Sequence, residues 1–253
     1  MKKIKRKTLL YKTGVEYGDY TINHVLGCSH GCMFPCYAFN LKKRFGIVKT
    51  YKDWIEPSIV SNALELLDKE LPRYKGKIKS VQLSFATDPF MMKYPEVSDL
   101  TIDIINRLNK DKIPVTTLTK GIIPDSVIGT SKMNMFGITL VSLDENFRKT
   151  YEPFSSNYIE RIRSLKHIHD KGYRTWVSIE PYPTPNILTQ SLDDLLESIK
   201  FVDYIVFGMW HYNSKVTQCK DKMNFYNECS KTVIEFCKKN NIKYHIKKGT
   251  LNI

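Results

Sequence analysis

The sequence predicts an α/β fold with parallel strands in a single domain. Strand-like and helix-like segments alternate along 253 residues, without internal repeats, low-complexity segments or an evident linker. A chain of this length commonly folds around one core, and 42% hydrophobic residues are enough to fill it. Parallel strands joined by helices give either an incomplete, open barrel of six units or an open sheet of the flavodoxin kind. The pattern alone leaves both alternatives open.

Seven segments have the composition of strands. They are residues 20–26, 78–85, 114–119, 136–142, 174–179, 204–207 and 242–246. Helical periodicity is found in residues 57–71, 98–109, 157–171, 192–200 and 224–239. Gly172 and the pair Asn240 and Asn241 are typical of the residues that end a helix. We expect residues 1–19 to form a basic N-terminal extension and residues 20–253 to form the domain.

Three cysteines, Cys28, Cys32 and Cys36, fall within nine residues directly after the first predicted strand. In a helix this spacing would align them as small core side chains, but Gly31 and Pro35 oppose a helix here. The thiols therefore lie on a loop at the carboxyl end of a strand, where barrel enzymes hold their chemistry. Such a loop can wrap thiolates around a metal.

The metal on this loop is either zinc or an iron–sulfur cluster. Structural zinc requires a fourth ligand, and His24 and His30 are candidates at poor spacing. A four-iron cluster can use only three cysteines and leave its fourth iron open to bind another molecule. Three soft thiolates on one loop favour the cluster.

Residues 23–38 read Asn-His-Val-Leu-Gly-Cys-Ser-His-Gly-Cys-Met-Phe-Pro-Cys-Tyr-Ala. This segment resembles the cluster loop of radical S-adenosylmethionine enzymes, especially the spore photoproduct lyase-like group, whose pattern is Gly-Cys-Ser-His-x-Cys-x-Tyr-Cys-Tyr-Ala. The resemblance implies a partial (β/α)6 barrel of the TIM type. It also implies that the three cysteines bind a [4Fe–4S] cluster whose open iron chelates S-adenosylmethionine. Pro35 changes the usual spacing of three and two residues to three and three, so the loop must bulge by one residue.

The same resemblance assigns cofactor-binding residues to the ends of the later strands. Thr87 and Asp88 offer oxygen atoms to the ammonium group of the cofactor. Lys120 offers a cation to the carboxylate or the ribose. Ser142 offers a hydroxyl to the ribose. Taken alone, Asp-Pro is an ordinary turn and Lys120 a solvated surface charge. The residues implied to bind the cofactor are Phe34, Tyr37, Ser84, Thr87, Asp88, Lys120 and Ser142.

Other features limit the chemistry that the resemblance implies. True spore photoproduct lyases carry a hydrogen-returning cysteine just before the Thr-Asp motif, and this chain has Ala86 there. Repair of the spore lesion by that route is therefore not expected. Glu152 and Arg161 are expected to form a structural ion pair rather than a catalytic one. Glu180 lies in a later block of the same resemblance, and its role is not fixed.

The charge balance bears on the substrate. There are 39 basic and 26 acidic residues, a net charge of +13, and basic clusters at residues 2–7, 42–44 and 238–248. Such a surface attracts nucleic acid, and aromatic side chains among the charges can stack on bases. A generally basic proteome explains the charge equally well, and peptides or small metabolites remain alternative substrates.

The sequence thus predicts a radical S-adenosylmethionine enzyme of the lyase or transferase type, supplied with electrons by a donor such as flavodoxin or ferredoxin. The rival classes are a zinc-bearing nucleic-acid-binding module and a cluster-bearing electron carrier. Cysteine usage, with no secretory signal and no apolar run of membrane-spanning length, predicts a cytoplasmic protein. The oligomeric state and the role of Cys219, Cys229 and Cys237 are not indicated; core or surface thiols are favoured over a second cluster.

Overall fold

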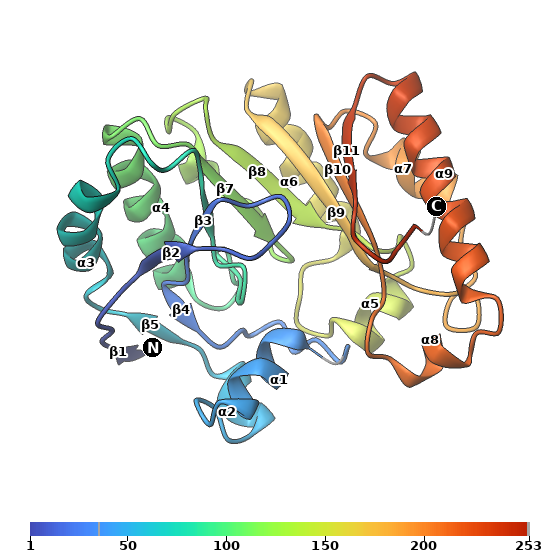
Figure 1. Ribbon diagram of the computed structural model, residues 1–253, viewed down its shortest axis with the longest axis horizontal. Helices are drawn as coiled ribbons and strands as arrows, with labels where there is room; N and C mark the ends of the chain where they lie inside the picture. The colour runs from blue at the N-terminus through green and yellow to red at the C-terminus, as the bar shows by residue number, and fades with distance from the viewer. Residues whose placement is uncertain (35, 252–253) are drawn as a thin grey trace.

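A large, curved sheet dominates the computed structural model, which describes residues 1–34 and 36–251 (Figure 1). Its strand order in the described residues is β11-β10-β9-β8-β7-β6-β3-β2. The strands are β2 (Leu10–Lys12), β3 (Tyr20–Ile22), β6 (Val81–Leu83), β7 (Val115–Thr119), β8 (Met135–Thr139), β9 (Arg174–Tyr182), β10 (Tyr204–Met209) and β11 (Lys243–Ile246). All neighbours are parallel except β2, which runs antiparallel to β3.

The strand order decides between the two predicted architectures. From β3 to β11 the parallel strands follow one another in sequence order, without the reversal that marks a doubly wound sheet. The edge strands β11 and β2 have no pairing with each other in the described residues, so the barrel stays open. The predicted partial barrel of α/β class is confirmed.

Helices occupy most of the six connections between the parallel strands. The β7–β8 connection is the exception, since its described residues form only a short 3₁₀ turn, η2 (Asp125–Val127). The helices are α1 (Tyr37–Arg44), α2 (Tyr51–Ile55), α3 (Ala63–Glu70) with η1 (Leu71–Tyr74), α4 (Pro95–Lys110), α5 (Glu145–Tyr151), α6 (Tyr158–Asp170), α7 (Leu192–Ser198), α8 (Ser214–Gln218) and α9 (Lys222–Lys239). Within the described chain, none of these helices has the length and apolar character needed to cross a membrane.

A second, small sheet corrects two predicted elements. Its order is β1-β5-β4, with β1 (Lys2–Ile4), β4 (Val25–Leu26) and β5 (Ser58–Val60). The strand predicted over residues 20–26 is broken, because β4 leaves the large sheet to pair with β5. The helix predicted over residues 57–71 begins only at Ala63, because β-branched residues 59 and 60 are paired with β1. Residues before 20 therefore contribute strands to both sheets.

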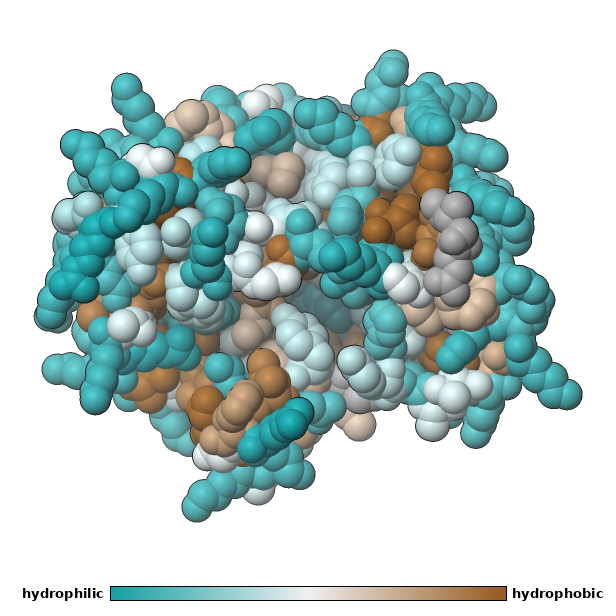
Figure 2. Space-filling model, viewed as in Figure 1, coloured by the Kyte–Doolittle hydropathy of each residue, from teal (hydrophilic) through white to brown (hydrophobic). Residues whose placement is uncertain are grey.

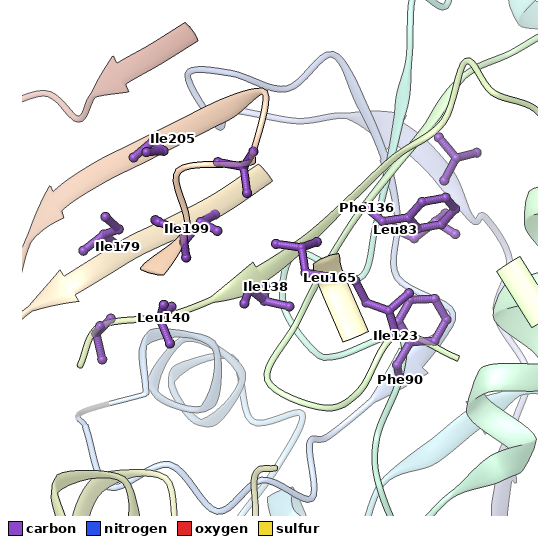
Figure 3. Close-up of a cluster of buried hydrophobic side chains, with 14 of the residues drawn as sticks. Leu83, Phe90, Ile123, Phe136, Ile138, Leu140, Leu165, Ile179, Ile199 and Ile205 are labelled. Carbon is purple, nitrogen blue, oxygen red and sulfur yellow. The ribbon is translucent and has the colours of Figure 1, made fainter. Parts of the chain in front are cut away.

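The core lies between the large sheet and its helices. Figure 3 shows buried side chains of the sheet and of the helices, with Leu165 of α6 near Ile138 of β8, and Ile179 of β9 nearer to Ile199. Gly137 on β8 is required by close packing, because a Cβ atom there would lie 2.3 Å from Nε1 of Trp176. That indole is fully buried and donates to the carbonyl oxygen of Thr117, 2.8 Å away.

The loop of residues 13–19, between β2 and β3, extends toward the β11 side of the opening (Figure 1). Oε2 of Glu16 lies 2.8 Å from Nε2 of His245 and accepts a hydrogen bond from the backbone N–H of Lys248. The ring of Tyr17 packs edge-on against Trp176 and Phe85. These contacts connect the two edges of the open barrel.

Candidate active site

A cavity of about 480 Å³ lies at the carboxyl ends of the parallel strands. The hollow at the centre of the view in Figure 2 lies over this end of the sheet. The cavity is lined by the cysteine loop and by residues that follow or end β6 to β10, namely Cys28, His30, Cys32, Phe34, Cys36, Tyr37, Ser84, Phe85, Ala86, Thr87, Asp88, Lys120, Thr139, Ser178, Glu180, Met209, Trp210, His211 and Tyr212. The sequence-predicted cysteines therefore share one cavity with most of the predicted cofactor-binding residues.

The backbone of the cysteine loop is held by α2. The N–H of Cys28 donates to the carbonyl oxygen of Trp54 at 2.8 Å, and the hydroxyl of Tyr51 donates to the carbonyl oxygen of Cys32, also at 2.8 Å. Gly27 has φ of 91°, and a Cβ atom there would lie 2.5 Å from the same Trp54 oxygen. Only glycine satisfies both conditions.

Asp88 connects the cysteine loop to the sheet. Its Oδ2 lies 2.9 Å from Nε2 of His30 and accepts from the backbone N–H of Lys120 at 2.7 Å. Its Oδ1 accepts from the backbone N–H of Phe90 and the hydroxyl of Thr119. Burial raises the pKa of this carboxyl, but His30 and the hydrogen bonds outweigh it and leave the pKa below its usual value. The carboxylate is thus charged and fully engaged within the protein.

Lys120 lies between the cysteine loop and a buried ion pair. Its Nζ is 3.7 Å from Sγ of Cys32, 4.5 Å from the centre of the Phe34 ring and 2.7 Å from Oε1 of Glu152. The other Glu152 oxygen lies 2.6 Å from Arg161, as expected for that pair. Burial raises the pKa of Cys32 to about 11 although the Lys120 ammonium opposes the shift. A thiolate there requires a cation beyond Lys120.

Glu152 and Arg161 are both fully buried. Arg161 also donates to the carbonyl oxygens of Thr139 and Ser156, at 2.8 and 3.1 Å. Burial would raise the pKa of Glu152, but the charges of Arg161 and Lys120 lower it to about 2. This network orients Lys120 toward the cavity.

Thr87 and Ser84 lie where β6 ends at the cavity. The Thr87 hydroxyl is buried and has no hydrogen-bond partner among the described residues. Ser84 adopts φ of 58°, a left-handed conformation that is rare for a residue with a side chain. Strained backbone and unsatisfied polar atoms are frequent at ligand sites. Both observations fit a bound polar ligand.

The remaining predicted residues differ in their placement. Phe34 is buried and stacks on Tyr151 with ring centres 5.6 Å apart. The hydroxyl of Tyr37 donates to the carbonyl oxygen of Phe85 and so connects α1 to the end of β6. Ser142 is fully buried, accepts from the N–H of Asp144 and is absent from the cavity lining. The structure does not bring it to the other predicted residues.

The three cavity cysteines are donors that either zinc or an iron–sulfur cluster accepts. Within the described residues, no three His, Cys, Asp or Glu side chains converge as the ligands of one ion would. Tetrahedral zinc needs all its ligands at bonding distance from one point, whereas a cluster takes each cysteine on a different iron. Cys219, Cys229 and Cys237 are free and absent from this lining, and Pro35 lies outside the described residues.

Sequence reasoning missed Thr139 and Ser178 and gave Glu180 no role. Glu180 lies at the cavity end of β9, 3.4 Å from Nζ of Lys247, and burial raises its pKa. Gly208 on β10 leaves room for it, since a Cβ atom there would lie 2.9 Å from the Glu180 carboxyl carbon. The available signal for Glu180 in the sequence was an acidic residue at a strand end, directly before Pro181. Of the three basic clusters, only Lys247 lines the cavity.

The fold is similar to that of spore photoproduct lyase and of Streptococcus suis SuiB. The structure of that lyase complexed with a dinucleoside spore photoproduct matches with a TM-score of 0.70 and 13% identity, covering 96% of this chain and 80% of the lyase. Streptococcus suis SuiB bound to S-adenosylmethionine matches with a TM-score of 0.53 and 14% identity, over 71% of this chain and 42% of SuiB. At such identities the likeness concerns the fold.

Two curated proteins are similar in sequence. An alignment of 187 positions with the uncharacterized protein MJ0683 of Methanocaldococcus jannaschii has 29% identity and covers 71% of this chain and 66% of that protein. An alignment of 206 positions with the uncharacterized protein ORF301 of Acidianus two-tailed virus has 24% identity and covers 74% of this chain and 64% of that protein. This chain thus spans somewhat less than two thirds of each relative. No known family profile matches it.

Proposed function

We propose that this protein is a radical S-adenosylmethionine enzyme. Cys28, Cys32 and Cys36 would hold a [4Fe–4S] cluster, and the adjoining cavity would bind the cofactor. The observation that carries the proposal is that three thiols from one loop share a cavity with an orphaned hydroxyl and a charged lysine, at the strand ends of this fold. Bound there, cluster and cofactor would supply one-electron reductive cleavage of the cofactor's sulfonium, the electron coming from an external reductant such as dithionite.

The protein residues would bind and orient the cofactor and exclude water from the cavity. The Thr87 hydroxyl can accept from the cofactor ammonium, and Lys120 can bind its carboxylate or ribose while Glu152 holds the lysine in place. Asp88 is engaged by four protein groups, so its proposed role is to position His30 and the cysteine loop. Aromatic side chains around the cavity, including Phe85 and Trp210, limit water access.

For the substrate we propose a nucleic acid. The net charge of +13 favours a polyanion, and the exposed ring of Tyr212 at the cavity provides a surface on which a base can stack. A matched fold is that of a lyase complexed with a dinucleoside lesion, while another, SuiB, is solved with a precursor peptide. Ala86 lines the cavity and offers no S–H group, which favours base modification over lesion repair with hydrogen return from that position.

Anaerobic reconstitution tests the proposal. The protein should bind about four irons and four sulfides and should release 5′-deoxyadenosine from S-adenosylmethionine with dithionite. Alanine at Cys28, Cys32 or Cys36 should abolish both, whereas Cys219→Ala, outside the cavity, should retain them. Stoichiometric zinc after anaerobic purification would instead identify a zinc module. Iron without cofactor cleavage would identify an electron carrier.

A further inference from the structure

An ion pair at the β11 end of the sheet faces the cavity and has no part in the proposed cofactor site. Oε1 of Glu180 lies 3.4 Å from Nζ of Lys247, each side chain is 23% exposed, and both line the cavity. Glu180 belongs to β9 and Lys247 directly follows β11. Thr87 and Lys120, which are proposed to bind the cofactor, follow β6 and β7 instead. The pair is thus offered to a ligand from other strands of the barrel.

The backbone positions both members of the pair. The register of β9 and β10 shifts between Phe207 and Met209, and the extra residue lies on β9, in the segment that contains Glu180. Such bulges are common beside active sites, where they redirect a side chain. The backbone N–H of Lys247 donates to the carbonyl oxygen of Phe207 at 2.9 Å. The two side chains therefore start from fixed points on either side of β10.

Gly208 on β10 leaves the space that the pair occupies. A Cβ atom there would lie 2.9 Å from Cγ and Cδ of Glu180 and 3.1 Å from Cγ of Lys247. Any other residue at this position would press on both side chains. Glycine weakens the interior of a strand and is found where another group must approach the backbone closely. The sequence thus gives up strand stability at the one position that both members of the pair share.

The carboxylate of Glu180 has capacity for a ligand. Asp88 accepts from four protein groups, whereas Lys247 is the only ion-pair partner of Glu180 among the residues that the structure describes. Burial raises the pKa of Glu180 and the Lys247 ammonium opposes that shift. Hydrogen bonds donated by a ligand would favour the charged form further. The pair presents, in order, the donor Nζ and the acceptors Oε1 and Oε2.

Aromatic rings lie beside the pair. Nζ of Lys247 is 5.9 Å from the centre of the Tyr17 ring, which is edge-on to Phe85 with ring centres 6.0 Å apart. Tyr212 also lines the cavity, is 89% exposed and has a left-handed φ of 58°. Flat rings next to hydrogen-bonding side chains are the means by which proteins hold an unstacked base.

We propose that Glu180 and Lys247 bind the Watson–Crick edge of a guanine in a single-stranded nucleic acid. This inference rests on the proposed function and names the base that the site selects. Guanine presents one acceptor, O6, followed by two donors, N1–H and N2–H. The lysine would donate to O6, and the two carboxylate oxygens would accept from N1–H and N2–H. Each of the other common bases matches at most two of these three groups.

A peptide backbone fits the pair less well. The N–H and C=O groups of a trans peptide bond point in opposite directions, so one amide cannot meet the ammonium and the carboxylate together. In a base, the donors and the acceptor lie side by side on one edge. The arrangement of the pair therefore favours a base over a peptide.

Anisotropy measurements on the cluster-loaded chain test the inference. The probes are labelled oligothymidylates and oligouridylates that carry one central guanine, adenine or hypoxanthine, the last being guanine without its N2 amino group. In at least one of the two series the guanine probe should bind at least about tenfold more tightly than the other two. Glu180→Gln, which keeps the side-chain size, should reduce this preference to less than about threefold, and Gly208→Ala should also reduce it. Glu197→Gln, an exposed carboxylate paired with Lys200, is the matched control and should retain it.

The outcomes separate this inference from the proposed function. Equal affinity for the guanine and adenine probes, or an undiminished preference in Glu180→Gln, would overturn the inference. Affinities no better than about 10⁻⁴ M for every probe would also overturn it, in favour of a peptide or metabolite. The hypoxanthine comparison uses the unaltered chain and so does not depend on the folding of a variant. The proposed function fails on a different result, the absence of 5′-deoxyadenosine with dithionite, and a guanine preference found alongside that absence would identify a binding protein instead.

Discussion

The Nε2 atom of His30, in the middle of the cysteine loop, lies 2.9 Å from Oδ2 of Asp88 at the end of β6, and both side chains are buried. This contact fixes the cysteine loop relative to the strand ends. A carboxylate that already accepts hydrogen bonds from Phe90, Thr119 and Lys120 has little capacity left for a ligand. Asp88 lies beside the cavity because it holds the cysteine loop through His30.

Asp88→Asn should therefore act on stability first. Replacing the carboxylate weakens charged hydrogen bonds to buried partners, and we expect the free energy of unfolding of the metal-free chain to fall by about 2–4 kcal/mol. Urea denaturation measures this. Asp125→Asn, which alters an exposed His–Asp pair with His167, should change it by less than about 1 kcal/mol. Normal stability combined with weak S-adenosylmethionine binding would show that Asp88 contacts the cofactor directly.

Lys120→Met should weaken S-adenosylmethionine binding to the cluster-loaded protein by about 1–3 kcal/mol, since a charged hydrogen bond is removed. Equilibrium binding with radiolabelled cofactor measures the loss. Lys132→Met, which removes a surface lysine packed over Tyr173, is the control and should bind normally. Unchanged affinity in Lys120→Met would show that Lys120 forms its ion pair with Glu152 but does not contact the cofactor.

Acid should destabilise the protein through Glu152. Its pKa is about 2 in the folded chain against an ordinary value of 4.5, so its stabilising contribution is complete above pH 4.5 and is lost as the pH falls from 4.5 toward 2. Between pH 6 and pH 3 this amounts to about 2 kcal/mol. Urea denaturation at both values should show a smaller acid loss for Glu152→Gln than for the unaltered chain. Glu235→Gln, an exposed change on α9, should reproduce the unaltered behaviour.

Single-stranded oligonucleotide should bind with log affinity falling linearly with log salt, as expected for phosphate contacts. Tyr212→Ala should lower the affinity by about 1–3 kcal/mol, the effect of losing one stacking surface. Tyr244→Ala, which lies on β11 outside the cavity lining, is the matched control. Fluorescence anisotropy measures both. An affinity no better than about 10⁻⁴ M at physiological salt would favour a peptide or metabolite substrate.

The sequence predicted the alternation of strands and helices because those signals are local, while the choice of an open barrel over a flavodoxin-like sheet came from the family resemblance. Strand composition and helical periodicity identified the parallel strands, and three cysteines on one loop indicated a common cavity. The ends of individual strands and helices depended on pairing with segments distant in sequence. Residues 57–60 have helical periodicity, yet β5 is a strand because β1 and β4 pair with it.

Several roles in the site also depended on distant contacts. Nothing next to Asp88 in the sequence indicates that its oxygens are taken by Thr119 and the N–H of Lys120. Ser142 follows a strand, as the other predicted cofactor-binding residues do, but it is absent from the cavity lining and its hydroxyl accepts a hydrogen bond from the backbone N–H of Asp144. Whether a side chain is free to bind a ligand depends on contacts that form only in the folded chain.

The contact between Glu16 and His245 joins residues 229 positions apart. Formation of such a contact carries a high loop-closure cost, so it is expected late in folding. During synthesis, the cysteine loop leaves the ribosome long before β11 exists to meet residues 13–19. If the proposed cluster were acquired by a nascent chain, it would lie in a half-built enclosure, open to solvent and oxygen. The proposed cluster would be fully enclosed only in the finished chain, once residues 13–19 have met β11.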